Sequence, residues 1–404
     1  MEVTMGFPFG EHGDSAVDVP HIRPFNVTTD GRVSLKQIKT IPRLAAAGRP
    51  HLAVGDLLFN NTNSLELVGK CALWRISGRF VFSNHMTRIR VQPGTIDPAF
   101  LAFALLHHWS SGRSRTLARA HVAQASIIGE RLREVAVPDF SDAEERAIGS
   151  ILAYVHRDMN LADREIELGE CLKRAAMREL FVRGLRGEPQ KQTAIGLVPE
   201  SWKRVRIGDL GAIVTGTTPP TKDTANYENG KLPFVSPGDF EHGTTITKTA
   251  KQLTPRGLAA ARSLPRGSTC FVSIGATVGK VGLVALDVCA TNQQINAIIP
   301  SAGIDPRFVF DLMTFWAGYI RSQASPGPLP ILSKGVFESI ELYVPKGVTE
   351  QSEISETLDA IDQKIDVHKR KKDLLDELFR ALLNGLMTGA VSASNLDLNA
   401  LHEA

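Results

Sequence analysis

Apolar residues recur every three to four positions over two long stretches, residues 141–186 and 348–389. This spacing predicts two long helices. In each stretch the apolar positions form two interleaved seven-residue series, which is typical of a coiled coil. Small residues at 162, 169 and 176 of the first stretch let a partner helix approach closely. The series of the second stretch are Ile354, Ile361, His368, Leu375 and Leu382, and Leu358, Ile365, Lys372, Phe379 and Leu386.

The remaining stretches, residues 1–140 and 206–347, are rich in glycine, proline and β-branched residues. Short alternating runs such as KLPFVSPG predict many short strands with tight turns and a few helices. Asp97-Pro98 and Asp305-Pro306 each precede an apolar helical pattern. Aspartate favours the N-cap and proline the first helical turn, so both pairs predict helix starts rather than a catalytic loop.

The chain carries an internal repeat with a period near half its length. Residues 94–109 match residues 302–317, residues 83–91 match 291–299, and residues 67–74 match 277–284. The two long helical stretches match at an offset of about 206 residues. The sequence therefore predicts an α+β fold with a pseudo-twofold repeat. In it, two tandem strand-rich domains with short helices are separated by two long helices that pair antiparallel as a coiled coil.

The domain boundaries follow from these changes in pattern. A first globular domain spans residues 1–140 and a first long helix 141–187. A linker at 188–205 leads to a second globular domain at 206–347. A second long helix at 348–389 is followed by a C-terminal tail at 390–404.

Charge and cysteine content narrow the classes of function. Both globular domains carry a surplus of Lys and Arg, whereas the helices are neutral or acidic, which favours nucleic acid on the former and protein contacts on the latter. No apolar run approaches the roughly 18 residues of a membrane span, and no signal peptide is indicated. The four cysteines form no zinc pattern. We therefore expect a cytoplasmic protein without a structural metal.

Residues 197–240 carry an ordered series of short motifs. They are Pro199 with Trp202, Ile207-Gly208-Asp209, Gly216-Thr217-Thr218-Pro219, Leu232-Pro233-Phe234 and Pro237-Gly238-Asp239. This series resembles the opening of a target-recognition domain in the specificity subunits of type I restriction–modification systems. The alternation of recognition domain and long helix resembles the architecture of that family over the rest of the chain.

The resemblance implies a non-catalytic subunit that binds double-stranded DNA. Its partners would be two methyltransferase subunits and, where present, restriction subunits. S-adenosylmethionine, ATP and Mg would be bound by those partners, and this chain would hold no cofactor. Each globular domain would read one half of a split, asymmetric target through the major groove. A helix of about 36 residues, roughly 54 Å long, is sufficient to separate two such half-sites.

Two alternatives stay open at this point. A self-contained DNA methyltransferase, or a recognition fragment of one, would need a cofactor-binding motif, and GATVGK at 275–280 lacks the spacing of a phosphate-binding loop. A coiled-coil adaptor without DNA binding would explain the helices but not the two basic domains.

Candidate site residues come from polar loop positions and from the apolar helix series; none is catalytic and none binds metal. The predicted DNA contacts are Thr217, Lys222, Lys280, Gln293, Gln294 and Lys70. The predicted partner contacts are Ile148, Leu152, Val155, Ile354, Leu358, Ile361 and Leu375. The first half lacks a counterpart of residues 199–216, so we expect the first domain to lack an edge strand. Residues 21–26 resemble the strand and turn at 237–239.

Overall fold

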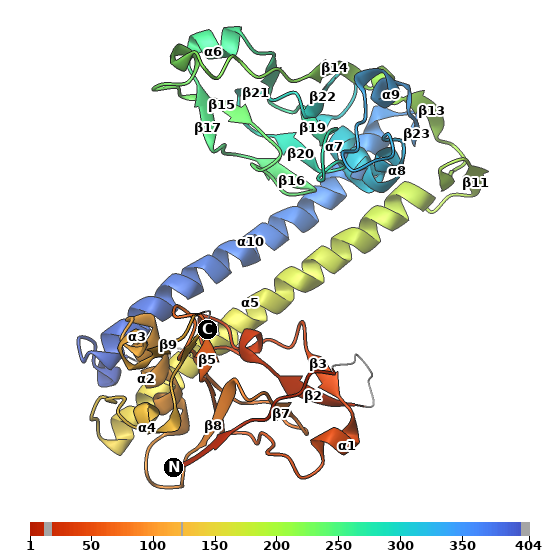
Figure 1. Ribbon diagram of the computed structural model, residues 1–404. Coiled ribbons are helices and arrows are strands. Elements are labelled where there is room, and N and C mark those ends of the chain that lie inside the picture. The colour runs from red at the N-terminus through yellow and green to blue at the C-terminus, as the bar shows by residue number, and fades with distance from the viewer. Residues whose placement is uncertain (12–17, 123, 397–404) are drawn as a thin grey trace. The chain divides into compact units, whose positions relative to one another are not determined.

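The computed structural model describes residues 1–11, 18–122 and 124–396. The chain divides into two compact units (Figure 1). Unit 1 comprises Met1–Arg164 and His368–Ala404, and unit 2 comprises Glu165–Val367. Each long helix contributes one part to each unit, so unit 1 is assembled from both ends of the chain. Most of the predicted tail, residues 397–404, lies outside the described residues.

Unit 1 is built on three small sheets. The largest has the antiparallel order β1 (Glu2–Met5), β8 (Met86–Arg90), β4 (Leu57–Asn60), β6 (Cys71–Leu73). The others are β3 (Lys39–Ile41), β2 (Val19–Ile22), β7 (Val81–Phe82), and β5 (Thr62–Asn63), β10 (Ala125–Ser126), β9 (Arg119–Ala120). Its helices are α1 (Arg43–Ala46), α2 (Pro98–Ser110), α3 (Ser114–Leu117), α4 (Gly129–Leu132) and the first half of α5 (Asp142–Arg183), with 3-10 turns η1 (Pro24–Asn26) and η4 (Ala393–Asn395).

Unit 2 repeats this plan with additional strands. Its main sheet has the order β14 (Gly211–Thr215), β22 (Ile295–Pro300), β19 (Thr269–Val272), β20 (Val281–Val284), β16 (Thr244–Ile246). A second sheet has the order β17 (Lys251–Leu253), β15 (Leu232–Val235), β21 (Val288–Thr291), β18 (Ser263–Pro265). Two pairs complete it, β11 (Gln190–Thr193) with β12 (Gly196–Pro199) and β13 (Lys203–Arg206) with β23 (Glu341–Val344). The helices are α6 (Pro255–Ala259), α7 (Pro306–Phe315), α8 (Ala317–Ser322), α9 (Lys334–Ser339) and the first half of α10 (Val348–Met387), with η2 (Ile207–Asp209) and η3 (Thr224–Asn226).

Strand order and direction confirm the predicted duplication. The order β1-β8-β4-β6 in unit 1 corresponds to β14-β22-β19-β20 in unit 2. In each unit a parallel pair joins the second sheet, β2 with β7 and β15 with β21. The same connectivity built twice confirms the predicted α+β fold class.

The expected loss of an edge strand from the first domain is wrong. Strand β1 pairs antiparallel with β8 at the edge of its sheet, as β14 pairs with β22 in unit 2. Four residues carry too little pattern to reveal a strand, and only the long-range pairing with β8 orders them as one. What the described part of unit 1 lacks is a counterpart of the β13–β23 pair.

The two Asp-Pro pairs begin helices, as predicted. The Asp97 carboxylate accepts a hydrogen bond from the Phe100 backbone N–H at 2.8 Å, at the start of α2. The Asp305 carboxylate accepts from Phe308 at 3.0 Å, at the start of α7. Both carboxylates satisfy backbone donors that the helix itself leaves unpaired. They are structural groups.

Within each unit the segments of α5 and α10 lie side by side (Figure 1). In unit 1, His156 packs on Phe379 with ring centroids 4.4 Å apart, and seven residues further along α5 Asp163 pairs with Lys372. The partner position on α10 falls as the position on α5 rises, so the segments run antiparallel, as predicted. In unit 2 a Cβ added to Gly169 would lie 2.6 Å from Ile365, which confirms the predicted close approach at a small residue.

Arg307 ties α7 to the helix pair in unit 2. Its guanidinium pairs with Asp311 at 3.2 Å, with Asp359 at 2.8 Å and with Asp362. The Asp311 side chain is fully buried, and burial raises the pKa of its carboxyl to about 7 although Arg307 acts in the opposite direction. The network holds the first turn of α7 against α10.

Candidate nucleic-acid interface

A glycine in close contact with neighbouring backbone follows the edge strand of each unit. Gly6 follows β1 and Gly216 follows β14, and both lie directly against backbone carbonyl groups. A Cβ on Gly6 would lie 2.2 Å from the Phe82 oxygen, and one on Gly216 would lie 2.1 Å from the Asn292 oxygen. Only glycine fits so close a backbone approach. At this glycine the chain passes directly over the backbone that leaves the second sheet, at Phe82 in unit 1 and at Asn292 in unit 2.

Replacing Gly216 by alanine is expected to destabilise unit 2 by about 1–3 kcal/mol, because the added methyl group overpacks a contact with rigid backbone. Gly318 in α8 is the matched control, since a Cβ there meets nothing within 4 Å. Gly318→Ala should be neutral or slightly stabilising. Chemical denaturation of both variants measures the difference. Equal midpoints for the two variants would contradict the close approach.

A second repeated feature is a short loop after β2 and β15, residues 23–26 and 236–239, which we call the locked loop. In unit 1 the Arg23 N–H donates to the Asn26 side-chain oxygen at 2.9 Å. In unit 2 the Ser236 N–H donates to the Asp239 carboxylate at 2.7 Å. The first residue of each loop is thus fixed by the fourth, which agrees with the resemblance noted between residues 21–26 and 237–239.

Two of the three lysines predicted to contact DNA, Lys70 and Lys280, bond to the backbone of this loop. Lys70 is buried, and its ammonium donates to the Pro24 carbonyl at 3.5 Å and to the Val27 carbonyl. Lys280 donates to the Pro237 carbonyl at 3.1 Å. Burial lowers the pKa of Lys70. Because both ammonium groups point inward to equivalent carbonyl oxygens, the placement favours a structural role for each lysine.

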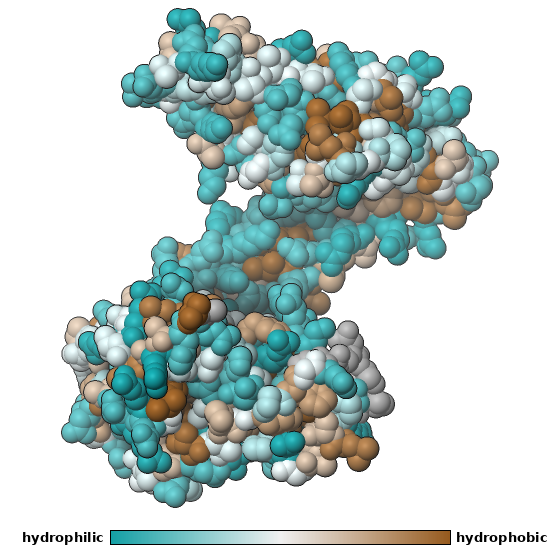
Figure 2. Space-filling view, viewed as in Figure 1, coloured by the Kyte–Doolittle hydropathy of each residue, from teal (hydrophilic) through white to brown (hydrophobic). Residues whose placement is uncertain are grey.

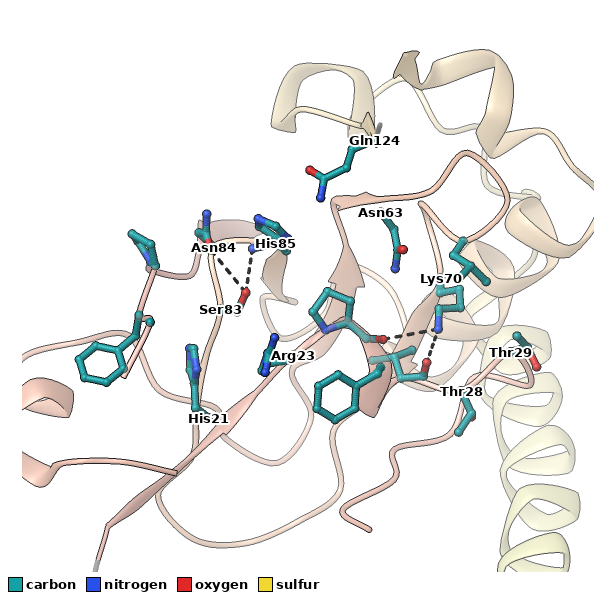
Figure 3. A pocket seen from close by; sticks show the side chains of 17 residues that line it. His21, Arg23, Thr28, Thr29, Asn63, Lys70, Ser83, Asn84, His85 and Gln124 are labelled. Carbon is teal, nitrogen blue, oxygen red and sulfur yellow. Dashed lines mark hydrogen bonds between the residues drawn. The ribbon is translucent and has the colours of Figure 1, made fainter. Parts of the chain in front are cut away.

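In unit 1 the locked loop, the segment after β1 and the β7–β8 turn line a hollow of about 1140 Å³ (Figure 3). Its polar lining is basic or neutral, and none of the described lining residues is acidic. Figure 3 shows Arg23 in the middle of the hollow, between Ser83 on one side and Lys70 on the other. The polar lining residues are His21, Arg23, Thr28, Thr29, Asn63, Lys70, Ser83, Asn84, His85 and Gln124. Such a lining suits a polyanion with hydrogen-bonding groups.

The remaining predicted DNA contacts lie on loops of unit 2. Gln293 is exposed in the β21–β22 turn, and its side-chain oxygen accepts from Thr218 at 2.5 Å. Gln294 is half-buried and bonds with Asn292 at 2.9 Å. Thr217 is half-buried, with its N–H donating to the Thr291 carbonyl at 2.9 Å. The structure brings Thr217 and Gln293 together at one end of the sheets; these contacts with DNA stay predictions.

Lys222 is exposed on the loop between β14 and β15. It lies five residues beyond Thr217, and the structure assigns it no described partner. As a freely solvated ammonium it keeps the properties of a phosphate contact. That role also stays a prediction.

Sequence reasoning missed Arg23, Asn63, Asn84, His85 and Gln124. The repeat offered a signal for two of them. Strand pairing places Met86 opposite Asn60 and Ile295 opposite Val272, so the β7–β8 turn aligns with the β21–β22 turn at an offset of 209 residues. This corrects by one residue the offset of 208 at which the sequence matched residues 83–91 with 291–299. Asn84 and His85 then correspond to Gln293 and Gln294. Asn63 and Gln124 carry no such signal, because only the fold brings them to the hollow.

The predicted partner contacts lie largely inside the two units. Five of the seven are buried, with at most 4% of each side chain exposed: Ile148, Leu152, Val155, Ile354 and Leu358. Ile361 and Leu375 are half-buried. The buried five pack into the cores beneath α2 and α7, so a partner protein has no access to them. The prediction that these five residues contact a partner subunit is therefore wrong. They pack each unit against its helices.

A different set of apolar residues on the two helices faces outward. Between 46% and 66% of each is exposed. The spacing of seven and then four residues places the three members on each helix within one narrow stripe. We call this set the exposed stripe; it consists of Leu161, Leu168 and Leu172 on α5, and Val367, Leu374 and Leu378 on α10.

The stripe obeys the repeat, because its members on α5 and α10 differ by 206 residues throughout. Figure 2 shows apolar surface interrupting the hydrophilic surface of the helices. Scattered single apolar residues are ordinary on a protein surface, whereas a stripe repeated on equivalent helix positions indicates a surface that contacts another protein. Among the described residues, no helix is both long enough and apolar enough to cross a membrane.

The repeated loops and the helix pair define a class of protein in which two similar recognition-type domains are joined through long helices. Comparison with known families shows what this chain resembles. Residues 199–377 match the model of the type I restriction modification DNA specificity domain. The resemblance seen in residues 197–240 is thereby confirmed.

Individual relatives extend the likeness over most of the chain. A putative type I restriction enzyme MjaX specificity subunit of Methanocaldococcus jannaschii is 25% identical over 344 residues, which cover 84% of this chain and 79% of that protein. The crystal structure of a type I restriction–modification S subunit from M. genitalium has the same fold, with a TM-score of 0.62, 15% identity and coverage of 95% and 93%. A second similar chain comes from a structural study of complex assembly and conformational transition in the type I R-M system. Its TM-score is 0.52 and its sequence identity is 18%, and the likeness covers 91% of this chain and 91% of that chain.

Proposed function

We propose that this chain is the DNA specificity subunit of a type I restriction–modification complex. The observation that carries the proposal is the duplication of one loop arrangement, a close glycine contact, a locked loop and a polar turn, on two units whose main sheets share one strand order. The loops carry different side chains in the two units. A protein built in this way binds two different half-sites, so its target is split and asymmetric. The family match of residues 199–377 supports the same conclusion.

The partners are two modification subunits, and the exposed stripe is where they bind. Equivalent stripes on α5 and α10 fit two copies of one partner, because each stripe presents the same apolar spacing. The similar chain from the structural study of complex assembly in the type I R-M system supports a complex of this kind. The modification subunits supply S-adenosylmethionine and the methyl transfer, and restriction subunits, where present, use ATP and Mg. This chain contributes recognition and no catalytic residue.

Methylation mapping tests the proposal. We expect the chain, assembled with its cognate modification subunits, to direct methylation to a split sequence with an unread spacer. The purified chain alone should bind duplex DNA with an affinity that falls steeply with salt, and should transfer no methyl group when given S-adenosylmethionine. Methyl transfer by the chain alone would establish the self-contained methyltransferase instead. DNA affinity that is absent at all salt concentrations, together with normal partner binding, would establish the adaptor.

A further inference from the structure

The locked loop is a rigid mount whose first residue differs between the two units. Its backbone is fixed from two sides in both copies, by the fourth residue of the loop and by the buried or half-buried lysine beneath it. Arg23 occupies the first position in unit 1, and Ser236 occupies it in unit 2. A protein that recognises different bases with two similar domains needs a rigid backbone on which the side chain at one position can vary.

The Arg23 guanidinium makes a cation–π contact with a neighbouring aromatic ring. It lies over the Phe25 ring, with 5.2 Å from the guanidinium carbon to the ring centroid. Stacking on an aromatic face orients the plane of a guanidinium and leaves its edge donors facing outward. Among the described residues the structure gives Arg23 no carboxylate partner, and the hollow that it lines has no described acidic residue. Its donors are therefore available to a ligand that enters the hollow.

The ligand that fits is the major-groove edge of guanine. Two parallel N–H groups of a guanidinium match the O6 and N7 acceptors of that base, a pairing that other bases do not offer in the same form. A serine in the same place, as in unit 2, has a single hydroxyl and cannot make this bidentate contact. The exposed Phe25 beside it limits how the guanidinium can tilt.

We propose that Arg23 is a specificity-determining residue that reads one guanine in the half-site bound by unit 1. The proposal rests on the proposed function, since it assumes that unit 1 binds DNA. Lys70 and Asn26 then act as positioning residues, which fix the backbone from which Arg23 reaches the base.

The test uses the chain assembled with its modification subunits and a library of DNA duplexes with randomised half-sites. Arg23→Ser should lower the preference for guanine at one position of one half-site roughly 10- to 100-fold, the effect of losing one good bidentate pair. The base preferences at the other positions of that half-site and in the other half-site should not change. The spacer length should also stay the same. Arg23→Lys should retain part of the preference, because lysine also donates to guanine but through a single ammonium.

Arg49→Ser is the matched control. Its guanidinium stacks on Phe7, 4.8 Å from the ring centroid, and it does not line the hollow. This variant should methylate the unchanged sequence. Thermal denaturation of all three variants establishes that they are folded.

Two results would overturn the inference about Arg23. One is an Arg23→Ser complex that keeps the wild-type preference at each position. The other is a uniform loss of affinity for all sequences with a weaker salt dependence, which marks a phosphate contact instead. Failure of the proposed function looks different, because the wild-type complex would then select no split sequence from the library. Lys70→Met should weaken the base preference at several positions of the same half-site, because it removes the hydrogen bonds that fix the backbone of the locked loop.

Discussion

Replacing Leu168 and Leu172 by glutamate is expected to remove one of the two modification subunits from the complex. Both leucines are more than half exposed, so the substitutions leave the core of the chain intact. In the complex each new carboxylate would be buried without a partner, which costs more than the roughly 1–3 kcal/mol that mutational data give for an unpaired amide or hydroxyl group. Two such groups weaken the contact at least about 30-fold. The equivalent pair on α10, Leu374 and Leu378, should remove the other subunit.

Native mass spectrometry of the reconstituted complex counts the bound subunits. We expect two in the wild type, one in either double variant and none in the quadruple variant. Arg174→Glu is the control, because it introduces the same change in charge on α5 but lies away from the exposed stripe. It should keep both subunits. If the quadruple variant kept both as well, the partners bind elsewhere on the chain.

Exchanging the globular part of unit 2 for that of a relative with another target is expected to change one half of the methylated sequence completely. The other half and the spacer length should stay the same, because unit 1 and the long helices are unchanged. The structure moves the proper boundary of this exchange to residues 188–347. A graft that began at 206 would separate β13, at Lys203–Arg206, from its antiparallel partner β23, at Glu341–Val344.

Methylation mapping of the exchanged complex measures the result. The reciprocal exchange of residues 1–140 should alter the opposite half. A graft of residues 206–347 serves as the structural control and should lower stability, because it pairs a native β13 with a foreign β23. Exchange at 188–347 that altered both halves together, or neither, would show that the two units do not read DNA independently.

The duplication could be read from the sequence because its signals are local. Asp97 and Asp305 cap helices through contacts with residues two or three positions away, so the Asp-Pro pairs were sufficient to place α2 and α7. The seven-residue series placed α5 and α10 for the same reason, since a helix brings positions seven apart to one face. The motifs at 197–240 marked Gly216 and the locked loop of unit 2 by their order alone.

The tertiary structure decided everything that depends on distant residues. Strand β1 exists because β8, more than eighty residues away, pairs with it. Lys70 and Lys280 each follow a turn, but the carbonyl groups of Pro24 and Pro237 accept hydrogen bonds from them and direct them inward. A lysine in a turn usually stays solvated, and nothing within a few residues of either lysine reveals these acceptors.

The helices show the same division most clearly. Leu152 and Leu161 are both leucines on α5, yet the first is fully buried and the second is half exposed. The periodicity of the sequence determines that each long helix has an apolar face. Each helix has more apolar positions than one helix–helix contact can cover. Which of these positions is covered depends on where α2 packs and where the second helix lies, and those contacts join residues far apart in the chain. The sequence thus determined the repeat, the helices and the recognition loops, while packing decided which side chains remain available to DNA and to partners.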